Sequence, residues 1–280
     1  MRGICGDDNG NIYFSYYNSI HVLNTFEDEL HPLFPQNNFT NAPYGLLYHR
    51  NALWTGNGCR IDLLTGRVDS LLPLDELTDK GVVVADDDDR LWFAYLNRLY
   101  RYDDRQKILL PYEPAFPPEV DISYLHLGRH TGTLWVGTNA HGLYALNRQR
   151  RLDRHWINED ERAPLAHNRI IAIYEGEGGQ LQLATAKGLQ ILDPESGDSR
   201  IYRVEEGLPN NFVNGLLPEG DSAIWVSTDN GLARLDLAQQ EFDGYQVEDG
   251  LSANEFNRIS FYRSARGRMF FGGLNGVNAF

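Results

Sequence analysis

The sequence predicts an all-β protein: a seven-bladed β-propeller of four-stranded antiparallel blades. A short apolar strand pattern recurs seven times, and its second, mostly aromatic position falls at residues 13, 54, 92, 135, 182, 225 and 270. The intervals are 41, 38, 43, 47, 43 and 45 residues, and a repeat of about 40–45 residues built from short strands is typical of propeller blades. Turn-forming residues separate the strands. Because seven such repeats fill 280 residues, we expect one propeller domain over residues 1–280.

One repeat is clear enough to divide into four strands. Phe212–Leu217 is predicted as the inner strand, and Ala223–Ser227 as the second strand. An Asn-Gly turn at Asn230 and Gly231 supplies the positive φ that a tight hairpin needs. Leu232–Asp236 and Glu241–Val247 complete the blade as its third and outer strands.

The repeated second strand predicts how the blades pack. Turn-competent residues stand three positions before each aromatic position: Gly10, Asn51, Asp89, Gly132, Gly179, Ser222 and Gly267. We expect Trp92, Trp135 and Trp225 to be largely buried between blades, where a large ring fills the wedge between twisted sheets. Gln182 replaces the ring in the fifth repeat, so that blade must pack differently or satisfy the buried amide.

Charge and composition exclude several classes of partner. The net charge of −14 argues against nucleic acid or an anionic membrane surface as the main partner. No stretch of 18 apolar residues could span a bilayer, and the N-terminus lacks the apolar centre of a signal peptide. Cys5 and Cys59 are predicted to be buried free thiols rather than a disulfide.

The sequence gives no sign of a cofactor or of a structural metal. The eight histidines show no metal-binding spacing, and no phosphate loop is present, so we expect neither. The acidic run Asp86–Asp89 raises the possibility of calcium, but it lacks the spacing of a calcium loop. We therefore favour a solvated hairpin tip for this run.

One pattern, seen in Leu134–Thr138 with Gly142–Leu143 and in Gly207–Asn211 with Ile224–Thr228, resembles the two-component regulator propeller repeat. Gly128–Leu146 carries much of that pattern, including Leu134–Thr138, and Glu206–Asn211 carries its Gly-Leu-Pro-Asn segment. The C-terminal segments Asp249–Asn257 and Phe271–Phe280 look like the last blade of these sensors. The resemblance implies a ligand-sensing propeller of a membrane-bound regulator, on the periplasmic or extracellular side of the inner membrane, and associates it with carbohydrates.

The resemblance also implies that the chain is a fragment of a larger receptor ectodomain. In the family the last blade, near residues 249–280, leads into a β-sandwich domain, and the full ectodomain could form a homodimer. We expect this fragment itself to make no membrane contact. The last blade is expected to lack its outer strand, so that the ring closes imperfectly.

A candidate ligand site follows from the repeat register. Counting 14 residues back from the aromatic position gives mostly short polar residues at the start of each inner strand: Thr40, Thr78, Asp121, Asn168, Asn211 and Phe256. With their neighbours, the candidate site residues are Asp121, Tyr124, Asn168, Arg169, Asn211, Asn214, Glu255, Asn257 and Arg258. These residue types also cap turns by bonding nearby backbone, and we give that interpretation the greater weight. If they bind an oligosaccharide, Tyr124 would stack on a sugar ring and the amides would bond its hydroxyls.

Three functions remain open at this point, and the first is favoured. They are a non-catalytic sensor that binds an oligosaccharide, a scaffold for protein–protein contact or dimerisation, and a polysaccharide lyase or glycosidase. Acidic residues are so numerous that a catalytic pair can always be drawn, and we assign no catalytic residue.

Overall fold

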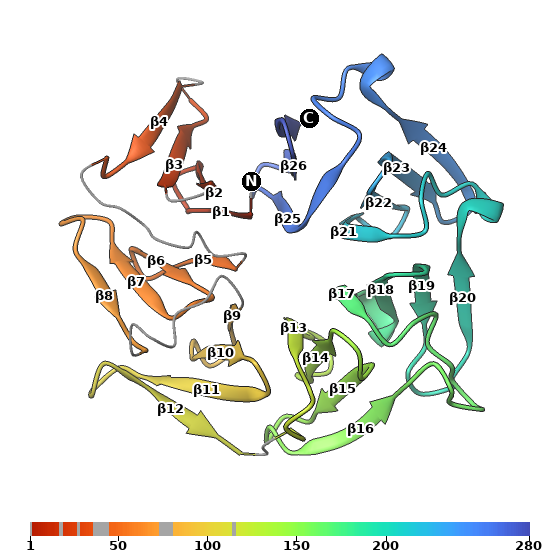
Figure 1. Ribbon diagram of the computed structural model, residues 1–280, viewed down its shortest axis with the longest axis horizontal. Helices are drawn as coiled ribbons and strands as arrows, with labels where there is room; N and C mark the ends of the chain where they lie inside the picture. Colours follow the sequence, from red (N-terminus) through yellow and green to blue (C-terminus); the bar gives the residue numbers. More distant parts are fainter. Residues whose placement is uncertain (1, 17–18, 27–28, 36–44, 73–80, 114–115) are drawn as a thin grey trace.

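The computed structural model describes residues 2–16, 19–26, 29–35, 45–72, 81–113 and 116–280. Seven sheets stand around a central channel, each forming one blade (Figure 1). Six sheets have four antiparallel strands in chain order from the centre outward, and the seventh has three. The predicted seven-bladed propeller is confirmed.

The strands follow one another blade by blade around the ring. Blades 1 to 3 contain β1 (Gly3–Gly6), β2 (Asn11–Tyr16), β3 (Ser19–Asn24), β4 (Glu29–Leu33), β5 (Leu46–His49), β6 (Ala52–Thr55), β7 (Cys59–Asp62), β8 (Val68–Ser70), β9 (Val82–Ala85), β10 (Leu91–Tyr95), β11 (Arg98–Asp103) and β12 (Ile108–Tyr112). Blades 4 and 5 contain β13 (Ile122–Leu127), β14 (Leu134–Thr138), β15 (Leu143–Leu146), β16 (Leu152–Trp156), β17 (Ile170–Glu175), β18 (Leu181–Thr185), β19 (Gly188–Leu192) and β20 (Ser199–Tyr202). Blades 6 and 7 contain β21 (Val213–Glu219), β22 (Ala223–Thr228), β23 (Gly231–Asp236), β24 (Glu241–Tyr245), β25 (Phe256–Arg263), β26 (Met269–Gly273) and β27 (Gly276–Ala279).

Helix is confined to single turns in the part of the chain that the structure describes. The 3-10 segments η2 (Glu177–Gly179), η3 (Val204–Glu206) and η4 (Val247–Asp249) have three residues each. In these described parts we find no helix with the length and apolar character needed to cross a bilayer.

The turns between the first two strands explain the spacing of turn residues in the sequence. Six of the seven predicted positions adopt a positive φ: Gly10, Asn51, Asp89, Gly132, Gly179 and Gly267. In blade 6 the left-handed residue is Gly220 (φ 58°), two positions before the predicted Ser222. These residue types tolerate a positive φ, so the hairpin sets the local sequence.

The repeated aromatic residue is anchored by a carboxylate that the sequence analysis did not single out. The Trp92 indole donates to Asp86 Oδ2 at 2.7 Å, and the Tyr13 hydroxyl donates to Asp7 Oδ2 at 3.0 Å. Trp225 likewise donates to Glu219 Oε2 at 2.9 Å. In all three blades the acid stands six residues before the ring, so the buried polar end of the ring is satisfied within its own blade.

Blade 4 obtains its carboxylate from the next blade. The Trp135 indole donates to Glu175 Oε2 at 2.7 Å, and Glu175 ends β17 of blade 5. The same carboxylate accepts from the Thr131 hydroxyl and from the backbone amides of His130 and Thr131. These bonds fasten the first hairpin of blade 4 to the inner strand of blade 5.

The acidic run Asp86–Asp89 is a hairpin turn, as favoured, but Asp86 is not solvated. Asp87, Asp88 and Asp89 are exposed, whereas Asp86 is buried beside the guanidinium of Arg150 at 3.5 Å. Burial by itself would raise the pKa of the Asp86 carboxyl, yet hydrogen bonds from Trp92 and the Arg90 amide lower it below its ordinary value. Asp86 is therefore a structural anchor.

The expected burial of the three tryptophans is correct for two of them. Trp92 is 1% exposed and Trp135 is 3% exposed, whereas Trp225 is only half-buried. Trp225 lies against Tyr245 on one side and against Phe280 at a ring distance of 4.5 Å. The three-stranded blade 7 covers it less completely than a four-stranded blade covers the other two.

Gln182 and the two cysteines can also be compared with expectation. Gln182 is buried, and its Oε1 accepts no hydrogen bond from the described residues. Both cysteines are free, as predicted, although Cys59 is only half-buried. Burial raises the pKa of the Cys5 thiol strongly, which makes this thiol unreactive.

Blades 1 and 7 pack against each other although blade 7 has only three strands. Phe14 and Phe270 meet at a ring distance of 6.2 Å, and β1 lies beside β25 in Figure 1.

We expect amide hydrogen exchange to be fastest in blade 7, because β27 is an outer strand without a covering neighbour in the described sheet. Exchange measured by mass spectrometry should show faster labelling of residues 256–280 than of blade 5. Equal protection in a monomer would contradict this prediction and would mean that the ring is as stable at blade 7 as elsewhere.

Candidate functional site

One end of the central channel carries the points where the chain enters the inner strands. At this rim the turn between the second and third strands of a blade bonds back to the start of the same blade. The Asn139 amide donates to the Asp121 carbonyl at 2.8 Å, and the Asp229 amide donates to the Phe212 carbonyl at 3.3 Å. The rim therefore gathers two rings of loops, one just before each inner strand and one after each second strand.

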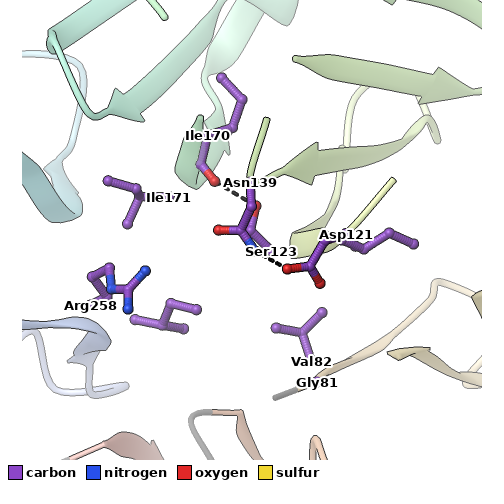
Figure 2. A pocket seen from close by; sticks show the side chains of 10 residues that line it. Gly81, Val82, Asp121, Ser123, Asn139, Ile170, Ile171 and Arg258 are labelled. Carbon is purple, nitrogen blue, oxygen red and sulfur yellow. Dashed lines mark hydrogen bonds between the residues drawn. The ribbon is translucent and has the colours of Figure 1, made fainter. Parts of the chain in front are cut away.

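A pocket of about 160 Å³ opens at this rim between four blades. Its lining comes from the starts of β9, β13, β17 and β25 and from the loop after β14: Gly81, Val82, Asp121, Ile122, Ser123, Asn139, Ile170, Ile171, Arg258 and Ile259. Figure 2 shows Arg258 on one side of the pocket, with Asp121 and Asn139 on the other side. Two of the predicted site residues, Asp121 and Arg258, thus meet across one cavity.

The polar wall on the blade 4 side is held in place by hydrogen bonds. Asn139 Nδ2 donates to Asp121 Oδ2 at 2.8 Å (Figure 2). The Ser123 hydroxyl donates to the Ile170 carbonyl of blade 5. Asp121, Ser123 and Asn139 form the polar lining of the pocket on this side, while valine and isoleucine side chains supply the apolar lining.

Arg258 reaches the pocket because β25 is irregular. Phe256 pairs with Gly273 and Phe261 pairs with Phe271, so five steps along β25 match two steps along β26. The extra residues form a bulge, in which Ile259 adopts a φ of 60°. Ile259 packs against the cluster that contains Val82 and Ile122, so the bulge carries its neighbour Arg258 to the pocket.

Arg169 stands just before β17, beside the pocket. Its guanidinium lies over the Phe212 ring at 5.3 Å, and its Nε is buried without a hydrogen-bond acceptor among the described residues. Burial lowers the pKa of Arg169, the positive charge of Arg258 lowers it further, and Asp121 and Asp229 act in the opposite direction. Arg169 and Arg258 therefore lie near enough to repel each other.

Asn168 and Asn211 cap backbone amides at the rim. Asn168 Oδ1 accepts from the Asn158 amide at 2.7 Å, and Asn211 Oδ1 accepts from the Val204 amide at 2.9 Å. The backbone carbonyl of Asn168 also accepts from the amide of Gly142, just before β15 of blade 4. That of Asn211 accepts from the amide of Gly188, the first residue of β19 in blade 5. The capping interpretation is correct for both residues, and their part in ligand binding stays a prediction.

The sequence analysis missed the third member of this set. Asn254 Oδ1 accepts from the Val247 amide at 2.8 Å, and its carbonyl accepts from Gly231. Fixed counting had selected Phe256 for this blade. The usable signal was the Gly-Leu motif, because Asn211 and Asn254 both stand four residues after its glycine.

The other predicted site residues are spread over the channel and rim. Tyr124 lies deeper, where it lines a channel cavity of about 110 Å³ with its ring 6.4 Å from that of Phe261. Asn214 is buried, and its Nδ2 donates to Asp229 Oδ1 at 2.7 Å. Glu255 is exposed and Asn257 is half-buried. Thr40 and Thr78 lie outside the described residues.

Burial strongly raises the pKa of the Tyr124 hydroxyl. The hydroxyl therefore remains neutral, and the ring lines the channel cavity together with Leu125 and Phe261. A sugar in the rim pocket would not stack on it without entering the channel.

The opposite face of the propeller carries a larger groove of about 400 Å³ between blades 2 and 3. Its charges are largely paired with one another: Arg50 with Asp89, Arg90 with Asp88, and Lys107 with Asp104. Nothing in the described parts of the chain groups three His, Cys, Asp or Glu side chains in a way that could hold a metal ion. The rim pocket is therefore the stronger candidate for a ligand.

Comparison with known proteins relates the chain to two-component regulators. A histidine kinase from Formosa agariphila, Histidine kinase P4, is 27% identical over 112 residues, which are 40% of this chain and 8% of that protein. The chain thus matches a small part of its curated relative. No family model matches the chain.

Solved structures share the fold. The extracellular domain assigned to the hybrid two-component system BT3049 of B. thetaiotaomicron superposes with a TM-score of 0.53 at 17% identity, covering all of this chain and 51% of that one. Virginiamycin B lyase from Staphylococcus aureus superposes with a TM-score of 0.75 at 14% identity, covering 99% and 93%. Such identities show a common fold, which hosts both regulators and enzymes.

The kinase match lies in the sequence and the BT3049 superposition lies in the fold. In sequence and in fold, the chain therefore resembles the propellers of two-component regulators.

Proposed function

We propose that this chain is a ligand-sensing propeller of a membrane-bound two-component regulator, on the periplasmic or extracellular side, and that it binds an oligosaccharide without catalysis. The observation that carries the proposal is the rim pocket, where groups from four blades converge on one cavity. Convergent polar groups above an apolar lining are what a specific ligand site needs.

The size of the pocket suits one sugar residue at the end of a longer chain. Its volume of about 160 Å³ is below the roughly 300–1,000 Å³ of pockets that enclose drug-sized ligands. Asp121 offers carboxylate oxygens to hydroxyl donors, Asn139 offers an amide carbonyl, and Arg258 offers donors from the other side. The open side of the rim leaves room for the remaining sugars to extend over the loops.

A lyase is the second candidate, because the chain superposes on virginiamycin B lyase over nearly its whole length. A lyase would have to break a bond in its substrate, whereas a sensor returns its ligand unchanged. Any oligosaccharide that binds should therefore be incubated with the protein and analysed by mass spectrometry. Recovery of shortened or unsaturated products would favour the enzyme.

A glycan array followed by calorimetry tests the proposal directly. For an oligosaccharide that binds, Asn139→Ala is expected to weaken affinity roughly 5- to 150-fold, because it removes a polar partner from a partly buried contact. Arg151→Gln on the opposite face is the control and should bind like the parent, since Arg151 is exposed in the turn between β15 and β16. Absence of binding to any glycan, or binding unaffected by the rim variant, would favour a protein–protein scaffold.

Asn211→Ala should behave differently from Asn139→Ala. Because Asn211 caps the Val204 amide, its loss should lower the free energy of unfolding by about 0.5–2 kcal/mol. Thermal denaturation of both variants separates this structural effect from a loss of ligand contacts. An unchanged melting temperature for Asn211→Ala would contradict its capping role.

A further inference from the structure

Two arginines at the rim have no acidic partner among the described residues, in a chain where acids are in excess. The chain has 39 acidic and 25 basic residues, and the half-buried Arg234 and the buried Arg150 are paired with Glu219 and Asp86. Within the described residues, neither Arg169 nor Arg258 has a carboxylate oxygen within the 4.0 Å of an ion pair. Arg258 nevertheless lines the pocket, and Arg169 directly precedes Ile170, which also lines it.

Leaving the Arg169 Nε donor without an acceptor is costly. Arg169 Nε is buried without an acceptor, and the stacking of the guanidinium on Phe212 holds it there. Buried donors that lack a partner disfavour a structure, and two like charges near each other add repulsion. An anion bound between the two guanidiniums would remove both penalties.

The facing wall of the pocket limits what kind of anion fits. Asp121 lies across the pocket from Arg258 and is held by Asn139 (Figure 2). A carboxylate on that side repels a plain anion such as phosphate but accepts hydroxyl donors. The isoleucine lining suits the C–H face of a ring. The ligand should therefore carry a negative group at one end and hydroxyl groups at the other.

We infer that the rim pocket takes a uronic acid residue of an acidic oligosaccharide, with its carboxylate toward Arg258 and Arg169 and its hydroxyls toward Asp121 and Asn139. This inference rests on the proposed function, since it specifies the kind of sugar that the same pocket binds. Arginine is suited to the role because its planar fork binds a carboxylate through two parallel hydrogen bonds.

The test uses matched pairs of ligands. Oligoglucuronides, oligogalacturonides and oligomannuronates are each compared by calorimetry with their carboxyl-reduced counterparts, which have the same linkages without the charge. At least one uronate is expected to bind about 10-fold or more tightly than its neutral counterpart, because a hydrogen bond to a charged group is stronger than a neutral one. Its affinity should fall as salt is added.

Variants assign that preference to the two arginines. Arg258→Gln should weaken uronate binding roughly 10- to 150-fold and weaken binding of the neutral counterpart much less. Arg258→Lys should fall between parent and Arg258→Gln, since it keeps the charge and loses the fork. Arg169→Gln should also reduce the preference, and Arg151→Gln is the control of equal charge change. Melting curves confirm that each variant is folded.

The outcomes separate this inference from the proposed function. Equal binding of uronates and their neutral counterparts would overturn the inference while leaving an oligosaccharide sensor in place. Binding of a sulfated neutral oligosaccharide in place of every uronate would likewise overturn the carboxylate assignment. Absence of binding to any glycan would overturn both proposals.

Discussion

Replacing Trp92 with alanine is expected to lower the free energy of unfolding by about 3–5 kcal/mol. The ring is 1% exposed and packs edge-on against Tyr112 at 4.7 Å, so its removal would leave a cavity in blade 3. The substitution also takes a hydrogen-bond donor from the buried Asp86 carboxylate, and it removes the ring over which the Arg150 guanidinium lies at 5.7 Å. Urea denaturation followed by circular dichroism measures the loss.

Trp225→Ala is the matched control, because Trp225 occupies the same repeat position and is only half-buried. We expect a clearly smaller loss of stability for this variant. Equal losses for the two variants, or a Trp92→Ala variant within about 1 kcal/mol of the parent, would show that the repeated ring does not stabilise the blades through burial.

Acidification from pH 6.5 toward 4 is expected to destabilise the protein through His126 by up to about 3 kcal/mol. Burial lowers the pKa of His126 from its ordinary 6.5 to about 4, although the Glu175 carboxylate opposes this shift. His126 Nε2 accepts a hydrogen bond from the Glu175 amide at 3.1 Å, which only an unprotonated nitrogen can do. Below pH 6.5 His126 is therefore protonated in the unfolded chain but not in the folded chain. The free energy of unfolding falls with pH until the folded ring titrates near pH 4.

His126→Gln tests this account, since a glutamine oxygen can accept the same amide without titrating. The difference in unfolding free energy between parent and His126→Gln should change with pH over this window, to the disadvantage of the parent in acid. His130→Gln is the control, because His130 is exposed on the same hairpin. A pH-independent difference for His126→Gln would contradict the assignment.

The repeat made most of the fold predictable. Strands in blade 6 begin and end within about two residues of expectation, since alternation and the Asn230–Gly231 turn define them locally. The carboxylates at Asp7, Asp86 and Glu219 also follow a local rule, six residues before the ring, and could have been found by inspecting each repeat. The bond from Trp135 to Glu175 could not, because it crosses between blades.

The candidate site was predictable only in part, for a physical reason. Inner-strand starts must gather at one rim in any propeller, so counting along the repeats leads to Asp121, which lines the rim pocket. The orientation of Arg258 depends on the bulge in β25, which no count along the sequence reveals. The short polar residues Asn168 and Asn211 looked alike as ligand contacts and as caps, and only their hydrogen bonds show the capping role.

The left-handed conformation of Ile259 has an energetic consequence for the rim. A β-branched residue at a φ of 60° costs roughly 1–2 kcal/mol relative to the right-handed region, a cost that glycine would avoid. The chain accepts this cost on the strand that carries Arg258, and its neighbours in the channel must offset it. The orientation of Arg258 is thus maintained at the expense of local stability. A sequence optimised only for thermostability would be expected to replace Ile259 and to lose this orientation of Arg258.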